Sequence, residues 1–159
     1  MRLTDYEKAM LNGDHGEIRQ QALQALYDLA TFYDVDQFVE IVGCHDDSTV
    51  YAGEAQVAFA EMLAEKGAKF AVPTTTNAAA CDINLWDRQK HDIEVMSATR
   101  RIEASHIKMG AVPTWSCAPY HIGVAPSFGQ QFASAESNVI CYYNSIIGAR
   151  TNRYAGPLE

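Results

Sequence analysis

The sequence lacks both a cluster of basic residues and a long apolar run. Among its 159 residues, 12 are Lys or Arg against 20 Asp or Glu, so the formal net charge is -8. The scattered basic residues leave no electrostatic footprint for nucleic acid, and we expect no nucleic-acid partner. No apolar stretch approaches the roughly 20 residues that span a bilayer, and the first residues do not resemble a signal peptide. We therefore expect no membrane partner and a cytoplasmic location.

Cysteine is also scarce. The chain has 4 cysteines, all far apart and without a CxxC pair, which disfavours a disulfide framework and a self-contained zinc site. Repeats and low-complexity tracts are missing too, so no internal boundary is evident. With 48% hydrophobic and 20% charged residues, the composition predicts one compact domain over residues 1–159.

Four helices are predicted before residue 110. Thr4 and Glu7 have the spacing of a capping box, which starts a short helix. Apolar residues recur every three or four positions over residues 18–33, as on one face of an amphipathic helix. Two further helices are expected over residues 51–66, closed by Gly67, and 91–109, stopped by Gly110.

Short strands are predicted between these helices at residues 38–43 and 70–72, and after them at residues 112–115. A last helix is predicted to start near Ser134 or Ala135. Strands separated by helices of this length are typical of βαβ units, because a parallel return needs a long crossover. The predicted fold class is α/β, with a mostly parallel sheet built from βαβ units.

Polar side chains follow two of the predicted strands. Thr74, Thr75 and Asn77 come after residues 70–72, and in open α/β sheets ligands bind beyond the carboxyl ends of strands. Their hydroxyl and amide groups suit a carboxylate or phosphate, although a helix N-cap and polar turn would use the same residues. His45 follows residues 38–43 and could orient a substrate; a metal site formed with the two aspartates after it is less favoured than a solvated acidic turn.

A second polar group lies near the end of the chain. Ser137 and Asn138 open the last predicted helix, and polar residues seven and eight positions later return to nearly the same face. A pocket would use this stripe, but a solvated face is the simpler alternative. Arg150 and Asn152 follow the helix, where an arginine could bind an anion or simply interact with the helix dipole.

Three segments together resemble the catalytic domain of the aconitase X family: PTTTNAAACD at 73–82, MGAVPTWSCAPY at 109–120 and AESNVICYYNSIIGARTNRYAGP at 135–157. The opening LTDYEKAMLNGDHGE at 3–17 is also similar to the start of that family. The resemblance covers nearly the whole chain, with the motifs in family order. It implies an aconitase-like fold, incomplete here relative to the full family domain.

The resemblance also implies a function. Family members are dehydratases whose substrates include mevalonate 5-phosphate in archaea and cis-3-hydroxy-L-proline in bacteria, both small anionic hydroxy acids. An iron-sulfur cluster, 4Fe-4S or 2Fe-2S, would bind the departing hydroxyl as a Lewis acid while a base removes a proton. The chain would be an N-terminal portion, with further cluster ligands and the base in a C-terminal portion or small subunit. We expect this chain alone to be inactive.

By this resemblance Cys117, in WSCAPY, is the cluster ligand, whereas without it a buried free cysteine would be the simpler interpretation. Cys44, Cys81 and Cys141 do not match ligand positions and are expected to be structural. Two other functions stay open. The chain could be a cluster-free module that binds a small anion or a partner subunit, or, with less support, a thiol enzyme that pairs Cys117 with a histidine such as His45 or His121.

Overall fold

The structure is a computed structural model that describes residues 1–48, 50–78 and 80–152. The chain divides into two compact units, Met1–Glu40 and Ile41–Glu159. The single domain expected from the sequence stays a prediction, and the last residues of the third family-like segment lie outside the described part. In that described part, no helix is both long and apolar enough to cross a bilayer.

The first unit consists of two helices, α1 (Asp5–Leu11) and α2 (Glu17–Phe32). The capping box is confirmed, because Thr4 Oγ1 accepts from the Glu7 amide at 3.2 Å while Glu7 Oε2 accepts from the Thr4 amide at 2.6 Å. Each side chain thereby satisfies a backbone N–H that the first turn leaves without a partner. The predicted helix over 18–33 is confirmed within one residue at each end.

The second unit is built on a five-stranded sheet in which all pairings are parallel. The strand order is β3-β2-β1-β4-β5. The bounds are β1 (Cys44–Asp47), β2 (Thr74–Asn77), β3 (Val112–Pro113), β4 (Gln131–Ser134) and β5 (Arg150–Thr151). The predicted α/β class with a mostly parallel sheet is confirmed.

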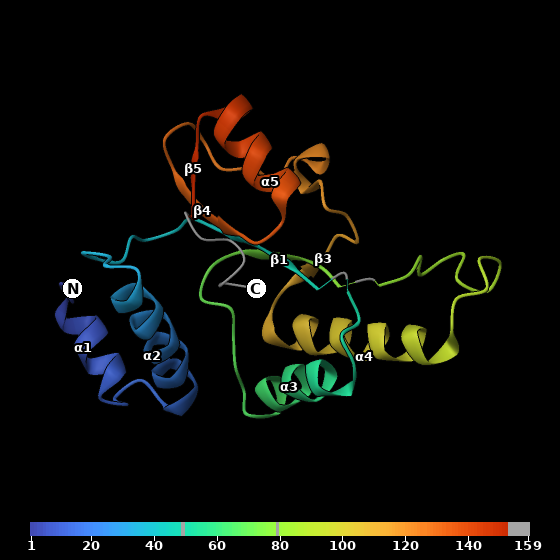
Figure 1. Ribbon diagram of the computed structural model, residues 1–159, viewed down its shortest axis with the longest axis horizontal. Helices are drawn as coiled ribbons and strands as arrows, with labels where there is room; N and C mark the ends of the chain where they lie inside the picture. The colour runs from blue at the N-terminus through green and yellow to red at the C-terminus, as the bar shows by residue number, and fades with distance from the viewer. Residues whose placement is uncertain (49, 79, 153–159) are drawn as a thin grey trace. The chain divides into compact units, whose positions relative to one another are not determined.

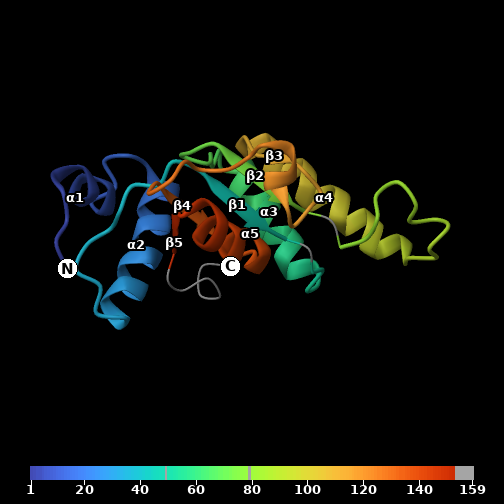
Figure 2. The same cartoon turned by 90° about the horizontal axis from the view of Figure 1, so that it is seen from above.

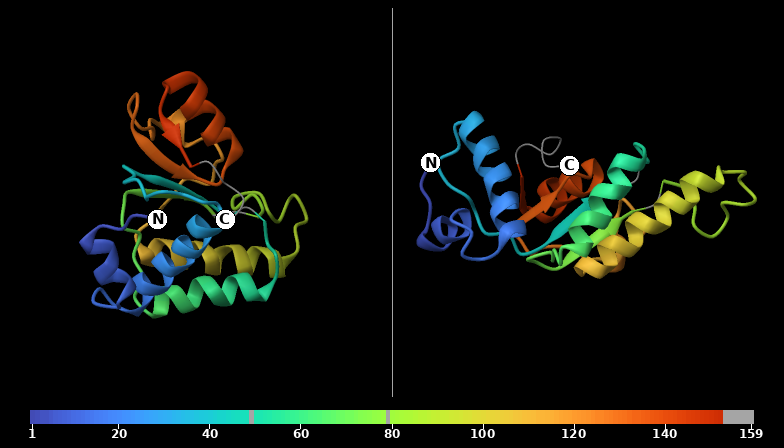
Figure 3. Two further views of the ribbon diagram at one scale, coloured as in Figure 1. Left: turned by 60° about the vertical axis from the view of Figure 1, so that its left-hand side comes forward. Right: turned by 90° about the horizontal axis from the view of Figure 1, so that it is seen from below.

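Helices cover both faces of this sheet. The connections after β1 and β2 contain α3 (Glu54–Glu65) and α4 (Ile93–Met109), which pack side by side on one face (Figure 1). On the other face lies α5 (Ser137–Tyr142), which continues into the π-helical turn η2 (Tyr143–Ile147) (Figure 3). Seen from above, residues 80–92 loop outward before α4 begins (Figure 2). The predicted helices over 51–66 and 91–109 are confirmed, with Asp92 as N-cap of α4 and Gly110 as its left-handed C-cap.

The strand order reverses between β1 and β4. From β1 the chain adds β2 and then β3 on one side, whereas β4 and β5 lie on the other side. The helices that follow β1 and β4 leave on opposite faces, so the carboxyl ends of these two neighbouring strands stand at a topological switch point. Open α/β sheets bind their ligands at such a point. Within the register, His45 of β1 is the partner of Ser134 of β4.

Two predicted strands were wrong. Residues 38–43 and 70–72 are irregular, and each strand begins just after the run that was expected to form it. Val39 and Val42 are 59% and 44% exposed. The buried residues of β1 and β2 are polar, and His45 and Thr76 bond to residues of the neighbouring strand, so the apolar runs only lead the chain into these strands. His45 and the Thr74–Asn77 segment, expected in loops beyond the strands, are therefore part of β1 and β2.

The end of the chain also differs from the prediction. Residues 131–134 form β4, so α5 begins at Ser137 rather than at Ser134 or Ala135. Arg150 and Thr151 form β5 instead of ending a helix. Gly148 ends η2 with φ +71, and a Cβ there would lie 2.7 Å from the ring of Phe128. Only glycine fits this turn, which lets the chain enter β5 so soon after the helix.

Each face of the sheet has its own apolar cluster. Between the sheet, α3 and α4 lie Val57, Ala78, Ala98 and Ile102. Under α5 lie Phe132, Val139, Tyr143 and Ala149, with the rings of Phe132 and Tyr143 edge to face at 4.9 Å. The two clusters hold the helices against opposite faces and so fix where the strand ends are presented.

Candidate functional site

His45 is the central side chain of the switch point. It is fully buried, and its Nδ1 lies 2.7 Å from Oγ1 of Thr75, its register partner on β2. Adjacent parallel strands place such partners on the same face, which explains how residues 30 positions apart form this bond. The structure thus brings together two residues that were predicted from the sequence as substrate-binding.

The second ring nitrogen of His45, Nε2, is also buried. Among the described residues, Nε2 has no partner in hydrogen-bond geometry. Burial lowers the pKa of His45, while Asp46, Asp47 and the backbone of Ser116 oppose that shift. In the neutral tautomer whose Nδ1 accepts the Thr75 hydroxyl, the proton is on Nε2, which is then a buried donor.

The segment from Thr114 to Ala118 crosses the carboxyl edge of the sheet. The Thr114 amide donates to the carbonyl of Thr76 at 2.9 Å, which anchors the start of the segment at the end of β2. Ser116 Oγ accepts from the Ala118 amide at 3.0 Å and closes a tight turn around Cys117. Cys117 is half-buried, and its Sγ lies 3.5 Å from Nδ2 of Asn138 on α5. The thiol and the amide, both predicted as site residues, are therefore in contact.

Asn152 completes the edge on the far side of β4. Its Oδ1 accepts from the Ser134 amide at 2.8 Å, which fixes the orientation of the side-chain amide because a backbone N–H can only meet the oxygen. The Nδ2 group then points away; it is buried and has no partner among the residues described. The edge thus carries two buried polar nitrogens, one on each side of Ser134.

The other face of β1 and β2 carries a polar cluster that the sequence analysis missed. Thr76 Oγ1 lies 2.9 Å from Oδ2 of Asp46 and 3.0 Å from Nδ1 of His106 on α4. Burial raises the pKa of Asp46, but hydrogen bonds from His106, Thr76 and Ser48 outweigh it, so the net shift is downward. The expected solvated acidic turn was wrong, because Asp46 lies inside β1. Alternation of polar residues along His45–Asp46 and Thr75–Thr76 is the signal that could have revealed it.

The other predicted binding residues lie less close to this edge. Thr74 points away from His45, since its hydroxyl donates to the Val72 carbonyl at 2.9 Å and its neighbour Thr75 faces the other way. Asn77 is buried and shares the face of Thr75 by alternation. Ser137 is exposed at the start of α5, beside Asn138. Arg150 is exposed and pairs with Gln131, three residues before Ser134, toward the amino end of the strands.

The residues present fit an iron-sulfur cluster only as a partial ligand set. The described part of the chain contains no group of three or more His, Cys, Asp or Glu placed to hold a metal. Burial, helped by Asp46, raises the pKa of Cys44 to about 12, so this thiol resists becoming a thiolate ligand. Cys81 is buried against Met96, and Cys141 is exposed on α5. Cys117, next to open polar groups at the switch point, is the thiol placed to contribute.

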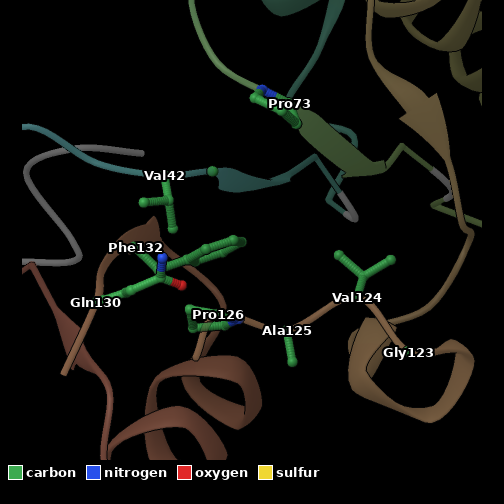
Figure 4. A pocket seen from close by; sticks show the side chains of 9 residues that line it. Val42, Pro73, Gly123, Val124, Ala125, Pro126, Gln130 and Phe132 are labelled. Carbon is green, nitrogen blue, oxygen red and sulfur yellow. The ribbon is translucent and has the colours of Figure 1, made fainter. Parts of the chain in front are cut away.

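A separate hollow of about 320 Å³ opens at the amino end of the sheet (Figure 4). Val42 and Pro73 precede β1 and β2, and Phe132 and Pro126 close the opposite wall. Gln130 supplies the one long polar side chain in this lining. Neither His45 nor Cys117 lines this hollow, so it is separate from the candidate site at the carboxyl edge of the sheet.

Comparisons with known proteins cover almost the whole chain. Residues 1–159 match the first domain of aconitase X. The chain is 35% identical over 154 residues to a cis-3-hydroxy-L-proline dehydratase of Pseudomonas aeruginosa, covering 97% of this chain and 27% of that protein. It is 33% identical over 153 residues to the phosphomevalonate dehydratase large subunit of Methanothermobacter thermautotrophicus, covering 95% of this chain and 38% of that subunit. These relatives are dehydratases, and the chain spans well under half of their length.

A solved structure shares the fold. The crystal structure of aconitase X from Thermococcus kodakaraensis, in its holo form, superposes with a TM-score of 0.83 at 33% identity, covering 99% of this chain and 39% of that one. The overall fold of the chain thus matches a known arrangement. With its whole length matched by the family's first domain, the chain belongs to the aconitase X family.

Proposed function

We propose that this chain is the substrate-facing first portion of a dehydratase that removes water from a small anionic hydroxy acid. Two contacts at the carboxyl edge of the sheet carry the proposal: Asn138 bonds to Cys117, and the buried His45 bonds to Thr75 on the neighbouring strand. The named substrates of the two relatives, cis-3-hydroxy-L-proline and phosphomevalonate, share a hydroxyl group and a carboxylate. We therefore assign residues of this chain to the hydroxyl and the carboxylate that both substrates carry.

Cys117 is the residue that would hold an iron-sulfur cluster, together with ligands from outside this chain. When bound, such a cluster supplies a Lewis acid for the departing hydroxyl. The side-chain amide of Asn138 donates to the sulfur of Cys117 at 3.5 Å, and a contact of this kind orients the ligand sulfur. The base that removes the proton is expected in the remaining portion of the enzyme.

His45 and Asn152 are the residues we assign to the substrate carboxylate. Among the described residues Nδ2 of Asn152 is a buried donor without a partner, and Nε2 of His45 is buried with no partner in hydrogen-bond geometry, although the Ser116 backbone interacts with the ring. Leaving such a donor unmet costs about 1–3 kcal/mol, which a bound oxygen would recover. Both are neutral, so they bind a carboxylate without the desolvation penalty of a buried cation. Thr75 fixes the imidazole of His45, and the Ser134 amide fixes Asn152, so neither donor has to be ordered when substrate arrives.

Dehydration by the complete enzyme tests this assignment. The chain is combined with the C-terminal portion, iron and sulfide, and loss of water is measured with cis-3-hydroxy-L-proline and with phosphomevalonate. Asn152→Ala and His45→Leu should each lower kcat/KM about tenfold to a hundredfold with whichever substrate is used. Asn144→Ala removes another side-chain amide, in η2, that is already bonded to Thr151 and Ile140; it is the matched control and should change kcat/KM little. Wild-type activity in both site variants would remove the carboxylate assignment.

A cluster-free module that binds a small anion is the second candidate. The neutral, buried donors of His45 and Asn152 would serve such a module equally well. It predicts anion binding without any dependence on iron or on Cys117. A cytoplasmic location and a C-terminal portion or small subunit as partner complete the proposal.

A further inference from the structure

Trp115, two residues before Cys117, has a backbone conformation that bulky residues avoid. Its φ of +46 lies in the left-handed region, where a side chain crowds its own backbone. A residue persists there only when its surroundings hold it in place, and such residues gather at functional sites. Burial does not hold this one, because the side chain of Trp115 is 46% exposed.

A hydrogen bond to α4 supplies the restraint. The indole Nε1 of Trp115 donates to Oε1 of Glu103 at 2.7 Å, and the other carboxylate oxygen accepts from Nη1 of Arg100 at 2.8 Å. Glu103 is only 6% exposed, so its carboxylate depends on these two donors in place of water. Removing one donor would leave a buried oxygen without a partner, which is why this bond resists breaking.

The two ends of the segment are bound to opposite layers. Trp115 is tied to α4 on one face of the sheet, whereas Cys117 contacts Asn138 of α5 on the other. The left-handed residue lets the chain turn between them, and the Thr114 amide is fixed on Thr76. If the indole were released, Trp115 could relax to an ordinary conformation and Cys117 would swing with it.

We propose that Glu103 and Trp115 are positioning residues that hold the Cys117 thiol at the carboxyl edge of the sheet. The identity of the group that the thiol binds rests on the proposed function, but the clamp itself does not. Arg100 supports Glu103 from the solvent side. The clamp orders the thiol before any cluster arrives, so binding does not have to order the segment.

Thiol alkylation measures the clamp directly. Iodoacetamide labelling of Cys117 is followed peptide by peptide by mass spectrometry in the wild type, Trp115→Phe, Glu103→Ala and the double variant. Each single variant should raise the Cys117 rate about tenfold, which corresponds to ~1.4 kcal/mol of lost restraint. The double variant should add little more, because both changes break the same bond. The exposed Cys141 is the internal control, and Trp86→Phe is the matched control variant.

Far-UV circular dichroism identifies any variant that fails to fold, and Glu103→Gln, which keeps an acceptor for the indole, then replaces Glu103→Ala with a smaller expected increase. An unchanged Cys117 rate in folded variants would overturn the proposal, as would full additivity in the double variant. Iron content of the chain combined with its C-terminal portion separates the two claims. If Cys117→Ser leaves bound iron unchanged while the clamp variants still free the thiol, the cluster assignment is wrong and the clamp stands.

Discussion

Replacing Thr75 by valine isolates the bond that orients His45. Valine keeps the shape of threonine but has no hydroxyl, so Nδ1 of a fully buried imidazole loses its partner at 2.7 Å. An unsatisfied buried polar group costs about 1–3 kcal/mol. With a urea dependence of about 2 kcal/mol per molar, the midpoint of unfolding should fall by about 1 M.

Thr74→Val is the matched control for this prediction. Its hydroxyl is equally buried but reaches only the nearby Val72 carbonyl, so its loss should cost about 1 kcal/mol or less. The double-mutant cycle with His45→Leu sharpens the test. Because an apolar pair leaves nothing unsatisfied, Thr75→Val should cost less in the His45→Leu background, with a coupling energy of about 1 kcal/mol or more.

Urea unfolding followed by circular dichroism supplies these numbers. Equal destabilisation by Thr75→Val and Thr74→Val would refute the claim that Thr75 is the partner that His45 needs. Additive costs in the double-mutant cycle would refute it too. Either result would leave the imidazole without a fixed tautomer and would weaken the assignment of Nε2 as a donor.

Three further predictions concern charge and packing. The pKa of His45 is lowered from 6.5 in the fold, so the free energy of unfolding should decrease as pH falls below 6.5, by at most ~1.4 kcal/mol per pH unit. In a pH series of urea titrations, His45→Gln should flatten this slope. Gly43→Ala places a Cβ 2.7 Å from the Phe132 ring and 3.2 Å from the Pro73 carbonyl, and should lower stability by about 1–3 kcal/mol, whereas no loss would show that this strand entry is loosely packed. Val57→Ala, at a fully buried position between α3 and α4, should cost about 2–3 kcal/mol in the same assay; a cost below about 0.5 kcal/mol would contradict the tight helix pair.

The helices were predictable because their signals are local. The Thr4–Glu7 capping box and the stop at Gly110 each act within one helical turn, and both were found where the sequence placed them. The mostly parallel sheet followed from the spacing of these helices. Strand order did not, because nothing local to β4 or β5 shows that they lie on the far side of β1.

The strands themselves were misplaced because apolar residues are expected inside a parallel sheet and polar residues in the loops, whereas β1 and β2 have the opposite distribution. Apolar runs that contain valine lead into the sheet, while the sheet interior contains His45, which bonds to Thr75, and Thr76, which bonds to Asp46. That satisfaction depends on register, which a single sequence does not display. The same holds for the site: Cys117 and Asn138 were both named, but their contact, and the clamp between Trp115 and Glu103, depend on how distant segments meet.

Anaerobic iron and sulfide analysis of the chain combined with its C-terminal portion tests the central claim most directly. Wild type and Cys141→Ser, which removes an exposed cysteine, should bind equal amounts of iron and sulfide, and Cys117→Ser should lose most of both. Equal iron and sulfide in wild type and Cys117→Ser, or none in any well-folded reconstituted sample, would contradict the account and favour the cluster-free anion-binding module.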